Sequence, residues 1–323
     1  MSTMMKRGLM GVMIISLVLS AFSGVGSAKF PEKPVTIIVG YRAGGSTDVV
    51  ARTFAPFLSR YLDVPVVVKN MTGAGGMIAM RHVYKQASDG YMLTILTLPS
   101  YVTVFLYKKG TGYDLKKFTL LHGVGGGDSN GVMVPYDSKM KSFHDILEIS
   151  KKEPITISAT SPGSNSWLLG LFLRERAGFK HKYVTFDSGR DATMAVVGGH
   201  VTAGIASTIN FPDLVKDKRV RVLGVGSPER LPYLPDTPTF TELGFPGVKL
   251  ITRQLVMAPP GLPDDKKKIL ASASAKAVAD PEFLVLARKQ GFTVGPLSPG
   301  ECRKELLDTF ENISKILKAA RIK

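Results

Sequence analysis

The sequence predicts an α/β fold of two lobes with a ligand cleft between them. Short β-branched runs alternate with stretches that carry apolar residues at helical spacing, a pattern typical of strand–helix units around a parallel sheet. The pattern occurs in residues 35–98 and again in residues 142–225. A further strand-like run at 251–257 indicates that the chain returns from the second lobe to the first. The first lobe is therefore expected to consist of two separate segments of the chain.

The first lobe opens with two units in which a strand ends in a glycine-rich turn at the start of a helix. The predicted order is a strand at 35–39, a turn at 40–48, a helix at 49–62, a strand at 64–68, a turn at 70–76 and a helix at 77–86. Parallel strands place such turns at one edge of the sheet, where open α/β sheets bind ligands. Because the first amides of a helix are unpaired and the dipole is positive there, the two turns predict an anion-binding cleft for a carboxylate.

The remaining elements extend the same plan. A strand at 92–98 ends at Pro99 and Ser100, which offer a third loop to the cleft, and residues 118–134 contain the crossing into the second lobe. The second lobe is predicted to contain helices at 142–151, 167–176 and 192–197, strands at 155–158, 183–186, 201–206 and 221–225, and small-residue loops at 159–166 and 187–191. After the return strand, helices at 264–279, from residue 280 and at 299–320 are expected to pack on the first lobe.

Residues 1–28 have the pattern of a cleaved signal peptide. Lys6 and Arg7 form a basic head, residues 9–21 form an apolar run, and residues 26–28 are small, as a cleavage site requires. The run is shorter than the ~20 residues that a spanning helix needs, which favours export to the periplasm over a retained membrane anchor. The predicted organisation is a signal peptide at 1–28, a first lobe at 29–130 plus 253–323, and a second lobe at 131–252.

The composition argues against several other classes of protein. The net charge of +16 comes from scattered basic residues, without basic clusters interleaved with aromatics, so nucleic acid is not expected as a partner. Cys302 is the only cysteine and the histidines lack metal-ligand spacing, so we expect no metal and no cofactor. No serine lies in a Gly-x-Ser-x-Gly motif, and the protein is not expected to be an enzyme. A secreted hydrolase that uses Asp187 or a histidine is the remaining enzymatic alternative.

A series of short segments in the mature chain has a familiar order. The segments are Pro31–Val39, Ala43–Arg52, Pro65–Asn70, Gly73–Gly76, Asp89–Tyr91, Phe186–Gly189, Val197–Val201, Leu234–Phe240, Gly244–Gly247 and Ala258–Gly261. Together they resemble the solute-binding proteins of tripartite tricarboxylate transporters, also called the Bug family, and its tricarboxylate-type branch in particular. The resemblance implies a two-lobed type II periplasmic-binding-protein fold that closes over a carboxylate like a Venus flytrap. It also implies delivery of the ligand to the permease subunits of a membrane transporter, and we expect the protein to be a monomer.

Two questions stay open at this point. The same closed form is equally suited to engaging a sensor kinase, which would make the protein a ligand sensor rather than a transport component. The ligand is a dicarboxylate, a tricarboxylate, an aromatic acid or a neutral molecule, and the sequence does not choose among them.

The predicted ligand-binding residues come from the two glycine turns, the loop after the third strand, the loops of the second lobe and the return strand. They are Arg42, Ala43, Gly44, Gly45, Ser46, Thr47, Asp48, Gly73, Ala74, Gly75, Gly76, Ser100, Ser161, Gly163, Ser164, Asn165, Asp187, Ser188, Gly189, Arg190, Asn210 and Arg253. Glycine lets the backbone approach a carboxylate closely, and the hydroxyl and amide side chains add donors.

The charged residues of this set have competing interpretations. Arg42, Arg190 and Arg253 are candidates for a bidentate grip on a second carboxylate, although a lone arginine is usually a surface residue. Arg190 and Arg253 stand where relatives usually have a glycine and an aromatic residue. Asp48 begins a helix, where capping is favoured over contact with an amino group of the ligand. Asp187 is expected to orient amides, because two carboxylates repel at short range.

Overall fold

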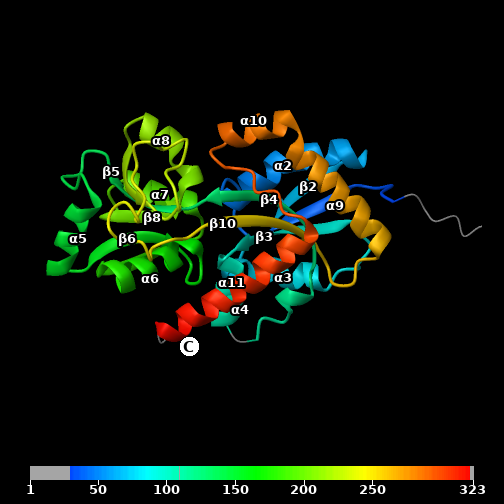
Figure 1. The fold of residues 1–323 in the computed structure, drawn as a ribbon, viewed down its shortest axis with the longest axis horizontal. Coiled ribbons are helices and arrows are strands. Elements are labelled where there is room, and N and C mark those ends of the chain that lie inside the picture. The colour runs from blue at the N-terminus through cyan, green and yellow to red at the C-terminus, as the bar shows by residue number, and fades with distance from the viewer. Residues whose placement is uncertain (1–29, 109, 321–323) are drawn as a thin grey trace, which may run out of the picture. The chain divides into compact units, whose positions relative to one another are not determined.

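The computed structural model describes residues 30–108 and 110–320. The signal peptide predicted at 1–28 lies outside these residues. The chain divides into a unit of residues 1–32 and a unit of residues 33–323, and both lobes belong to the second unit. This unit contains two five-stranded sheets, each with helices on both faces, which is the two-lobed α/β architecture that the sequence predicts (Figure 1). No helix in the described ranges is long and apolar enough to cross a membrane.

The sheet of the first lobe has the strand order β2-β1-β3-β10-β4. β1 pairs in parallel with β2 and β3, and β10 runs antiparallel between β3 and β4. β1 and β3 are buried along almost their whole length, which explains why their sequences are continuous apolar runs instead of alternating ones. The strands are β1 (Val35–Val39), β2 (Val66–Asn70), β3 (Met92–Leu98), β4 (Thr119–Asp128) and β10 (Thr252–Ala258).

Helices cover both faces of this sheet. Figure 1 shows α2, α9 and α10 on one face and α3, α4 and α11 on the other. β1 leads into α2 and β3 leads into α4, so these two helices begin at the carboxyl edge of the sheet. The helices are α2 (Ser46–Leu62), α3 (Met77–Tyr84), α4 (Ser100–Tyr107), α9 (Asp264–Ala279), α10 (Pro281–Lys289) and α11 (Pro299–Ala319), with short 3-10 turns η1 (Ala74–Gly76) and η2 (Leu115–Lys117).

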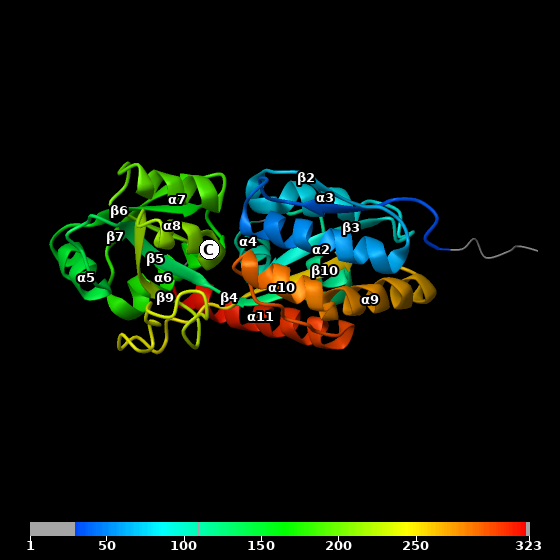
Figure 2. The same ribbon diagram turned by 90° about the horizontal axis from the view of Figure 1, so that it is seen from above.

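The second lobe repeats the plan of the first. Its strand order is β7-β6-β8-β5-β9, with β6 parallel to β7 and β8, and with β5 antiparallel to both of its neighbours. Figure 2 shows α6 and α7 flanking this sheet. The elements are β5 (Asn130–Pro135), α5 (Phe143–Lys152), β6 (Ile155–Thr160), α6 (Asn165–Ala177), β7 (His181–Phe186), α7 (Gly189–Val197), β8 (Ala203–Ser207), η3 (Thr208–Asn210), α8 (Pro212–Lys216) and β9 (Val220–Val225).

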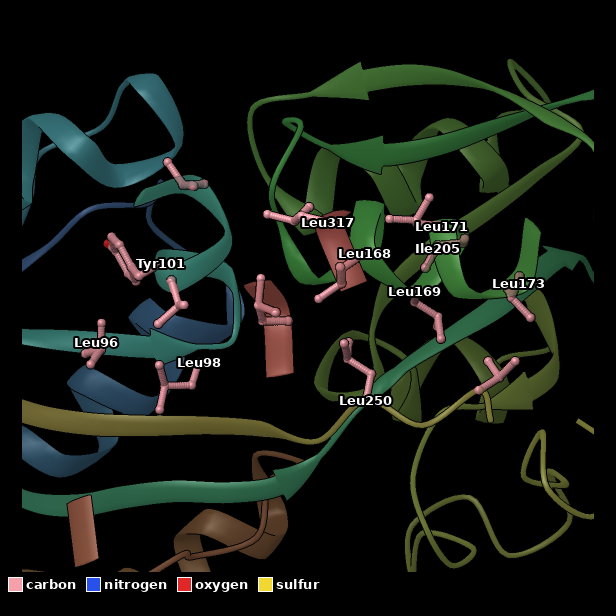
Figure 3. Close-up of a cluster of buried hydrophobic side chains, with 14 of the residues drawn as sticks. Leu96, Leu98, Tyr101, Leu168, Leu169, Leu171, Leu173, Ile205, Leu250 and Leu317 are labelled. Atoms are coloured by element: carbon pink, nitrogen blue, oxygen red, sulfur yellow. The ribbon is translucent and has the colours of Figure 1, made fainter. Parts of the chain in front are cut away.

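One cluster of buried apolar side chains includes residues of both lobes. Figure 3 shows members of this cluster from β3 and α4, from α6 and β8, and from α11, among them Leu98, Leu168 and Leu317. Complete burial of such a side chain contributes about 1.5–3 kcal/mol to stability. A second cluster, which includes Val196 and Phe211, lies on the side of the second sheet that α7 and α8 cover. These clusters fix the sheets beneath the loops that form the site.

The chain passes between the two sheets at adjacent places. β4 ends at Asp128 in the first sheet and β5 begins at Asn130 in the second, so Ser129 alone separates them. The return strand β10 begins at Thr252, which pairs with Asp128. The Ser129 hydroxyl donates a hydrogen bond to the carbonyl of Leu250 at 2.6 Å. The outward and return connections are therefore tied to each other.

Candidate functional site

A cavity of about 70 Å³ is lined by loops from both lobes at the carboxyl edges of the two sheets. Small hydroxyl and amide side chains dominate its lining. From the first lobe come Tyr41, Gly45, Ser46, Thr47, Thr97, Ser100 and Thr252, and from the second come Asn130, Thr160, Ser164, Asn165, Ser166, Asp187, Ser188, Gly189, Ala206, Ser207 and Asn210. Of these lining residues, Asp187 alone carries a formal charge.

Two helices of the first lobe begin at this cavity without a side-chain cap. Gly45 precedes α2 and Pro99 precedes α4, and within the described part of the chain no side chain accepts a hydrogen bond from the first turn of either helix. The amides of these turns have no intrahelical partner, and each helix dipole adds a partial positive charge. The first lobe therefore presents two sets of unpaired amides to the cavity, an arrangement suited to an anion.

Asp48 holds the loop before α2 in place without lining the cavity. Its carboxylate is 2% exposed and accepts hydrogen bonds from the Gly44 amide at 2.8 Å, from Arg52 Nε at 2.9 Å and from Asn70 Nδ2 at 2.7 Å. Asn70 Nδ2 also donates to the carbonyl of Tyr41 at 2.9 Å. The network fixes the backbone that carries the uncapped amides. Asp48 does not form the helix cap that the sequence favoured, because its carboxylate binds the loop before α2 and the side chains of Arg52 and Asn70 instead of the first-turn amides.

Four hydroxyl groups on the first lobe's side form two pairs. Tyr41 Oη lies 3.0 Å from Ser100 Oγ, and Thr47 Oγ1 lies 2.9 Å from Thr97 Oγ1. Burial raises the pKa of Tyr41 to about 12, so its phenol stays neutral at ordinary pH. These pairs set the orientation of the hydroxyl groups and contribute no net charge to the cavity.

The helices of the second lobe begin differently. Ser164 Oγ accepts a hydrogen bond from the Trp167 amide at 3.2 Å at the start of α6, and Ser188 Oγ accepts one from the Asp191 amide at 3.0 Å at the start of α7. Each serine satisfies one of the otherwise unpaired amides. The second lobe thus supplies capped helix starts where the first lobe supplies uncapped ones.

The three candidate arginines lie outside the cavity lining. Arg42 pairs with Asp187 at 3.0 Å and with Asp191 at 3.5 Å, so it bridges the first lobe to the second. The side chain of Arg190 lies against Gly44 and lines a neighbouring cavity of about 350 Å³. Arg253 lies beside Gly126 and Gly295, and its Nε is 3.9 Å from a carboxylate oxygen of Glu305 on α11.

Comparison with known proteins identifies the family. The family model described as "Tripartite tricarboxylate transporter family receptor" matches residues 50–321. The chain belongs to this receptor family. The Bug-family membership that the sequence motifs indicate is therefore confirmed.

Individual relatives of this receptor family cover most of the chain. A Cupriavidus necator protein named "UPF0065 protein in gbd 5'region" is 31% identical over 260 residues, which are 79% of this chain and 77% of that protein. The solved structure of the periplasmic binding protein BugD is 26% identical, with a TM-score of 0.85, and the match covers 91% of this chain and 99% of that one. The solved structure described as "R. palustris Rpa4515 with adipate" is also 26% identical, with a TM-score of 0.86 and the same coverage. The predicted periplasmic-binding-protein fold is confirmed.

The receptor's cavity brings together only part of the set predicted from the sequence. Those predicted residues that line it are Gly45, Ser46, Thr47, Ser100, Ser164, Asn165, Asp187, Ser188, Gly189 and Asn210. Those that do not are Arg42, Ala43, Gly44, Asp48, Gly73, Ala74, Gly75, Gly76, Ser161, Gly163, Arg190 and Arg253.

The second glycine turn packs against α4 and does not line the cavity. A side chain on Gly76 would lie within 2.6 Å of the Tyr101 ring, and one on Gly75 would lie 3.3 Å from Val104. Gly73, Gly75 and Gly76 have φ between 67° and 125°, which L-residues rarely adopt. The glycines therefore allow α4 to pack closely against this turn.

Several lining residues were missed in the sequence. They are Tyr41, Thr97, Asn130, Thr160, Ser166, Ala206, Ser207 and Thr252. Thr160 and Ser207 are the last residues of β6 and β8, and Thr97 is next to the last residue of β3. The rule that placed the loops at the strands' carboxyl ends would have found these three as well.

The side chains of the described residues offer no obvious metal centre. No group of three or more His, Cys, Asp or Glu side chains within 30–108 and 110–320 is arranged to hold a metal ion. The predictions that the protein uses no metal and no cofactor stay predictions.

Proposed function

We propose that this protein is a periplasmic receptor that captures a small carboxylate and delivers it to the membrane subunits of a tripartite tricarboxylate-type transporter. The observation that carries the proposal is the convergence of two uncapped helix starts, those of α2 and α4, on one cavity. Membership of the receptor family supports the transport role. The adipate that accompanies Rpa4515 in its solved structure supports a carboxylate ligand.

The proposed mechanism is capture on one lobe followed by closure of the other. A carboxylate first accepts hydrogen bonds from the amides at the starts of α2 and α4, where it needs no arginine because the backbone and dipoles supply the positive potential. The second lobe then brings Ser164, Ser188 and Asn165 to the ligand's other side. No bond is made or broken, and the binding free energy stabilises the closed form that the transporter recognises.

We place the moving boundary at the two connections between the sheets. The proposed lobe limits, at 130/131 and at 252/253, each lie one residue past the start of a strand, since β5 begins at Asn130 and β10 at Thr252. Ser129 and its hydrogen bond to Leu250 tie the two connections, so they are expected to bend together. Export through the signal peptide at 1–28 and action as a monomer complete the proposal.

A binding assay on the purified protein tests the proposed function. Thermal unfolding is followed with a panel of mono-, di- and tricarboxylates and with neutral analogues. A ligand that binds only the folded state adds about 2.7 kcal/mol at a concentration a hundredfold above its dissociation constant, so a true ligand raises the unfolding midpoint clearly. A panel in which no carboxylate raises the midpoint would sink the proposal. The same holds if neutral analogues bind as tightly as the acids.

A further inference from the structure

We propose that the ligand of this cavity is a short monocarboxylic acid with an uncharged hydroxyl group, and that Asn165 recognises the hydroxyl. The proposal rests on the proposed function, because it takes the α2 and α4 amides as the carboxylate site. It concerns what the ligand presents to the opposite side of the same cavity.

The side-chain orientation of Asn165 is fixed by its partners. Asn165 Nδ2 donates to the carbonyl of Leu98 at 3.4 Å and to Thr252 Oγ1 at 3.2 Å. A backbone carbonyl only accepts, so the nitrogen of the amide has to face Leu98 and the oxygen has to face the other way. Asn165 is 7% exposed, lines the cavity, and its Oδ1 has no hydrogen-bond partner among the described residues. A buried acceptor without a partner is unfavourable unless a ligand supplies a donor.

A second amide oxygen has the same character. Asn130 begins β5, is 4% exposed and lines the cavity, and its Oδ1 also lacks a hydrogen-bond partner in the described part of the chain. Asn210 Nδ2, from the same lining, is a buried donor without a hydrogen-bond partner among the described residues. This side of the cavity therefore offers two unpaired amide oxygens and one unpaired amide donor. A ligand hydroxyl both donates and accepts and can satisfy groups of both kinds, whereas a second carboxylate only accepts.

The charges around the cavity select a neutral donor over an ammonium group. The carboxylate of Asp187 is 75% exposed and pairs with Arg42 at 3.0 Å, and that of Asp48 is bound by Arg52 and lies outside the lining. No buried carboxylate among the described lining residues is left to balance a buried ammonium ion, and a buried charge needs such a partner. A hydroxyl group satisfies the amide oxygens without this requirement.

The size of the cavity favours a short molecule. Its volume is about 70 Å³, and a water-sized group needs about 10–15 Å³ on the same measure. The cavity therefore holds about five such groups. Glycolate and lactate are of this size, whereas a long diacid such as adipate is larger. A longer diacid would have to extend past Asn210 toward the neighbouring cavity, where Arg190 and Lys289 lie.

Isothermal titration calorimetry with the unmodified protein compares matched acids in a buffer free of carboxylates and phosphate. Lactate and glycolate are set against propionate and acetate, which lack the hydroxyl, against alanine and glycine, which replace it with an ammonium group, and against malate and adipate, which add a second carboxylate. We expect lactate or glycolate to bind at least about tenfold more tightly than its partner without the hydroxyl. We also expect it to bind more tightly than the amino acids and the diacids.

An Asn165→Ala variant assigns the preference to a residue. The variant also loses the bond to Leu98, so its affinity for every acid is expected to fall. The decisive readout is the ratio of the lactate and propionate affinities, which should drop from at least about tenfold toward one. Asn312→Ala removes an exposed amide on α11 and serves as the matched control, with an unchanged ratio.

The outcomes separate this inference from the proposed function. Tighter binding of malate or adipate, or equal binding of lactate and propionate, overturns the hydroxy-acid inference and leaves the carboxylate receptor standing. Tighter binding of alanine than of lactate does the same. Failure of every acid to bind overturns both. A lactate preference that survives in Asn165→Ala overturns the role given to Asn165.

Discussion

The two lobes have the same sheet plan but different helix starts. In each sheet three parallel strands lie beside one antiparallel strand, and the chain enters that strand from the other lobe. In the second lobe, serines cap the helices that face the cavity, whereas in the first lobe α2 and α4 start without a cap.

The difference teaches how two similar lobes divide one task. A helix start can be satisfied by its own side chain or by a ligand, and in the proposed function the first lobe leaves that place open for the ligand. The capped second lobe gains the stability of its serines, typically about 1 kcal/mol each, and approaches the ligand with hydroxyl and amide groups. The stability that the first lobe lacks is what an anion can supply on binding.

Giving α2 a cap of its own should produce the largest change. Gly45 has φ −76° and ψ 163°, a conformation that any residue adopts, so Gly45→Asp is expected to fold. Its carboxylate would accept the first-turn hydrogen bonds, stabilise the ligand-free protein by about 0.5–2 kcal/mol and occupy the anion site. We expect the affinity for the carboxylate ligand to fall by at least about 100-fold, or about 2.8 kcal/mol, in calorimetry.

Gly45→Ala is the control for this variant, because a Cβ there would lie 3.3 Å from the Arg42 carbonyl. It separates crowding from capping. An aspartate variant that binds the acid as tightly as the unmodified protein would show that the α2 start is not the anion site.

Removing a single amide from α2 should have a smaller effect. Ser46 is the first residue of the helix, where proline is tolerated and lacks only an N–H that has no intrahelical partner. Ser46→Pro is expected to weaken carboxylate binding by about 10- to 100-fold, since a hydrogen bond to a charged group contributes about 1.5–3 kcal/mol. Ser46→Ala keeps the amide and should lose much less. Equal losses of affinity in the two variants would show that the Ser46 hydroxyl, and not its amide, contacts the ligand.

The connection between the lobes should respond to pH. Burial raises the pKa of Asp128 to about 7, against the lowering effects of its hydrogen bonds, including one to Ser207, and of the nearby Arg253. The folded state therefore holds a proton that the unfolded state has lost. This contribution to stability is fully present below the unfolded-state pKa of 3.8 and is lost as the pH rises through about 7.

Asp128→Asn should abolish the loss of stability at higher pH, because an amide cannot ionise. At about pH 8 we expect the variant to be more stable than the unmodified protein by about 1–2 kcal/mol in urea unfolding, and the difference should shrink as the pH falls toward the unfolded-state pKa of 3.8. A variant that is less stable at the higher pH would show that the ionised carboxylate is satisfied in the folded protein.

The caps of the second lobe should give the smallest effect. Ser188→Ala removes the acceptor for the Asp191 amide and is expected to lower the free energy of unfolding by about 1 kcal/mol. Ser46→Ala in the first lobe, where the hydroxyl caps nothing, should stay within about 0.5 kcal/mol. Urea unfolding of the two variants measures this difference between the lobes. Equal losses in the free energy of unfolding would contradict it.

The sequence contained enough to place the fold and the edge of the sheet where the site lies. Strand runs such as Val35–Val39, followed by a glycine turn and helical spacing, are local patterns that can be read without knowing the contacts between distant segments. The family motifs added the two-lobed arrangement. Thr97 and Ser207 lie at the carboxyl ends of strands, as the predicted loops do. Both would have been predicted if the same rule had been applied to the last residues of the strands as well as to the loops.

Other features depend on contacts between distant segments. The second glycine turn looks like the first in sequence, yet its Gly76 makes room for Tyr101, a residue outside the turn itself. The direction of a long side chain is harder still to predict from the sequence. Arg42, for example, pairs with Asp187 across the lobes and does not line the cavity. The uncapped state of α2 is also invisible in the sequence, since Ser46 and Asp48 look like capping residues until their positions are known.

The ion pairs that Arg42 forms with the second lobe bear on how the ligand would be released in the proposed function. Its pairs with Asp187 and Asp191 are exposed on both sides, and exposed ion pairs contribute only about 0–1 kcal/mol and weaken with salt. A strong buried ion pair between the lobes would oppose opening and would slow release of the ligand. In the proposed function, a weak bridge would let the lobes separate with little resistance, so the residence time of the ligand would depend mainly on the ligand's own contacts.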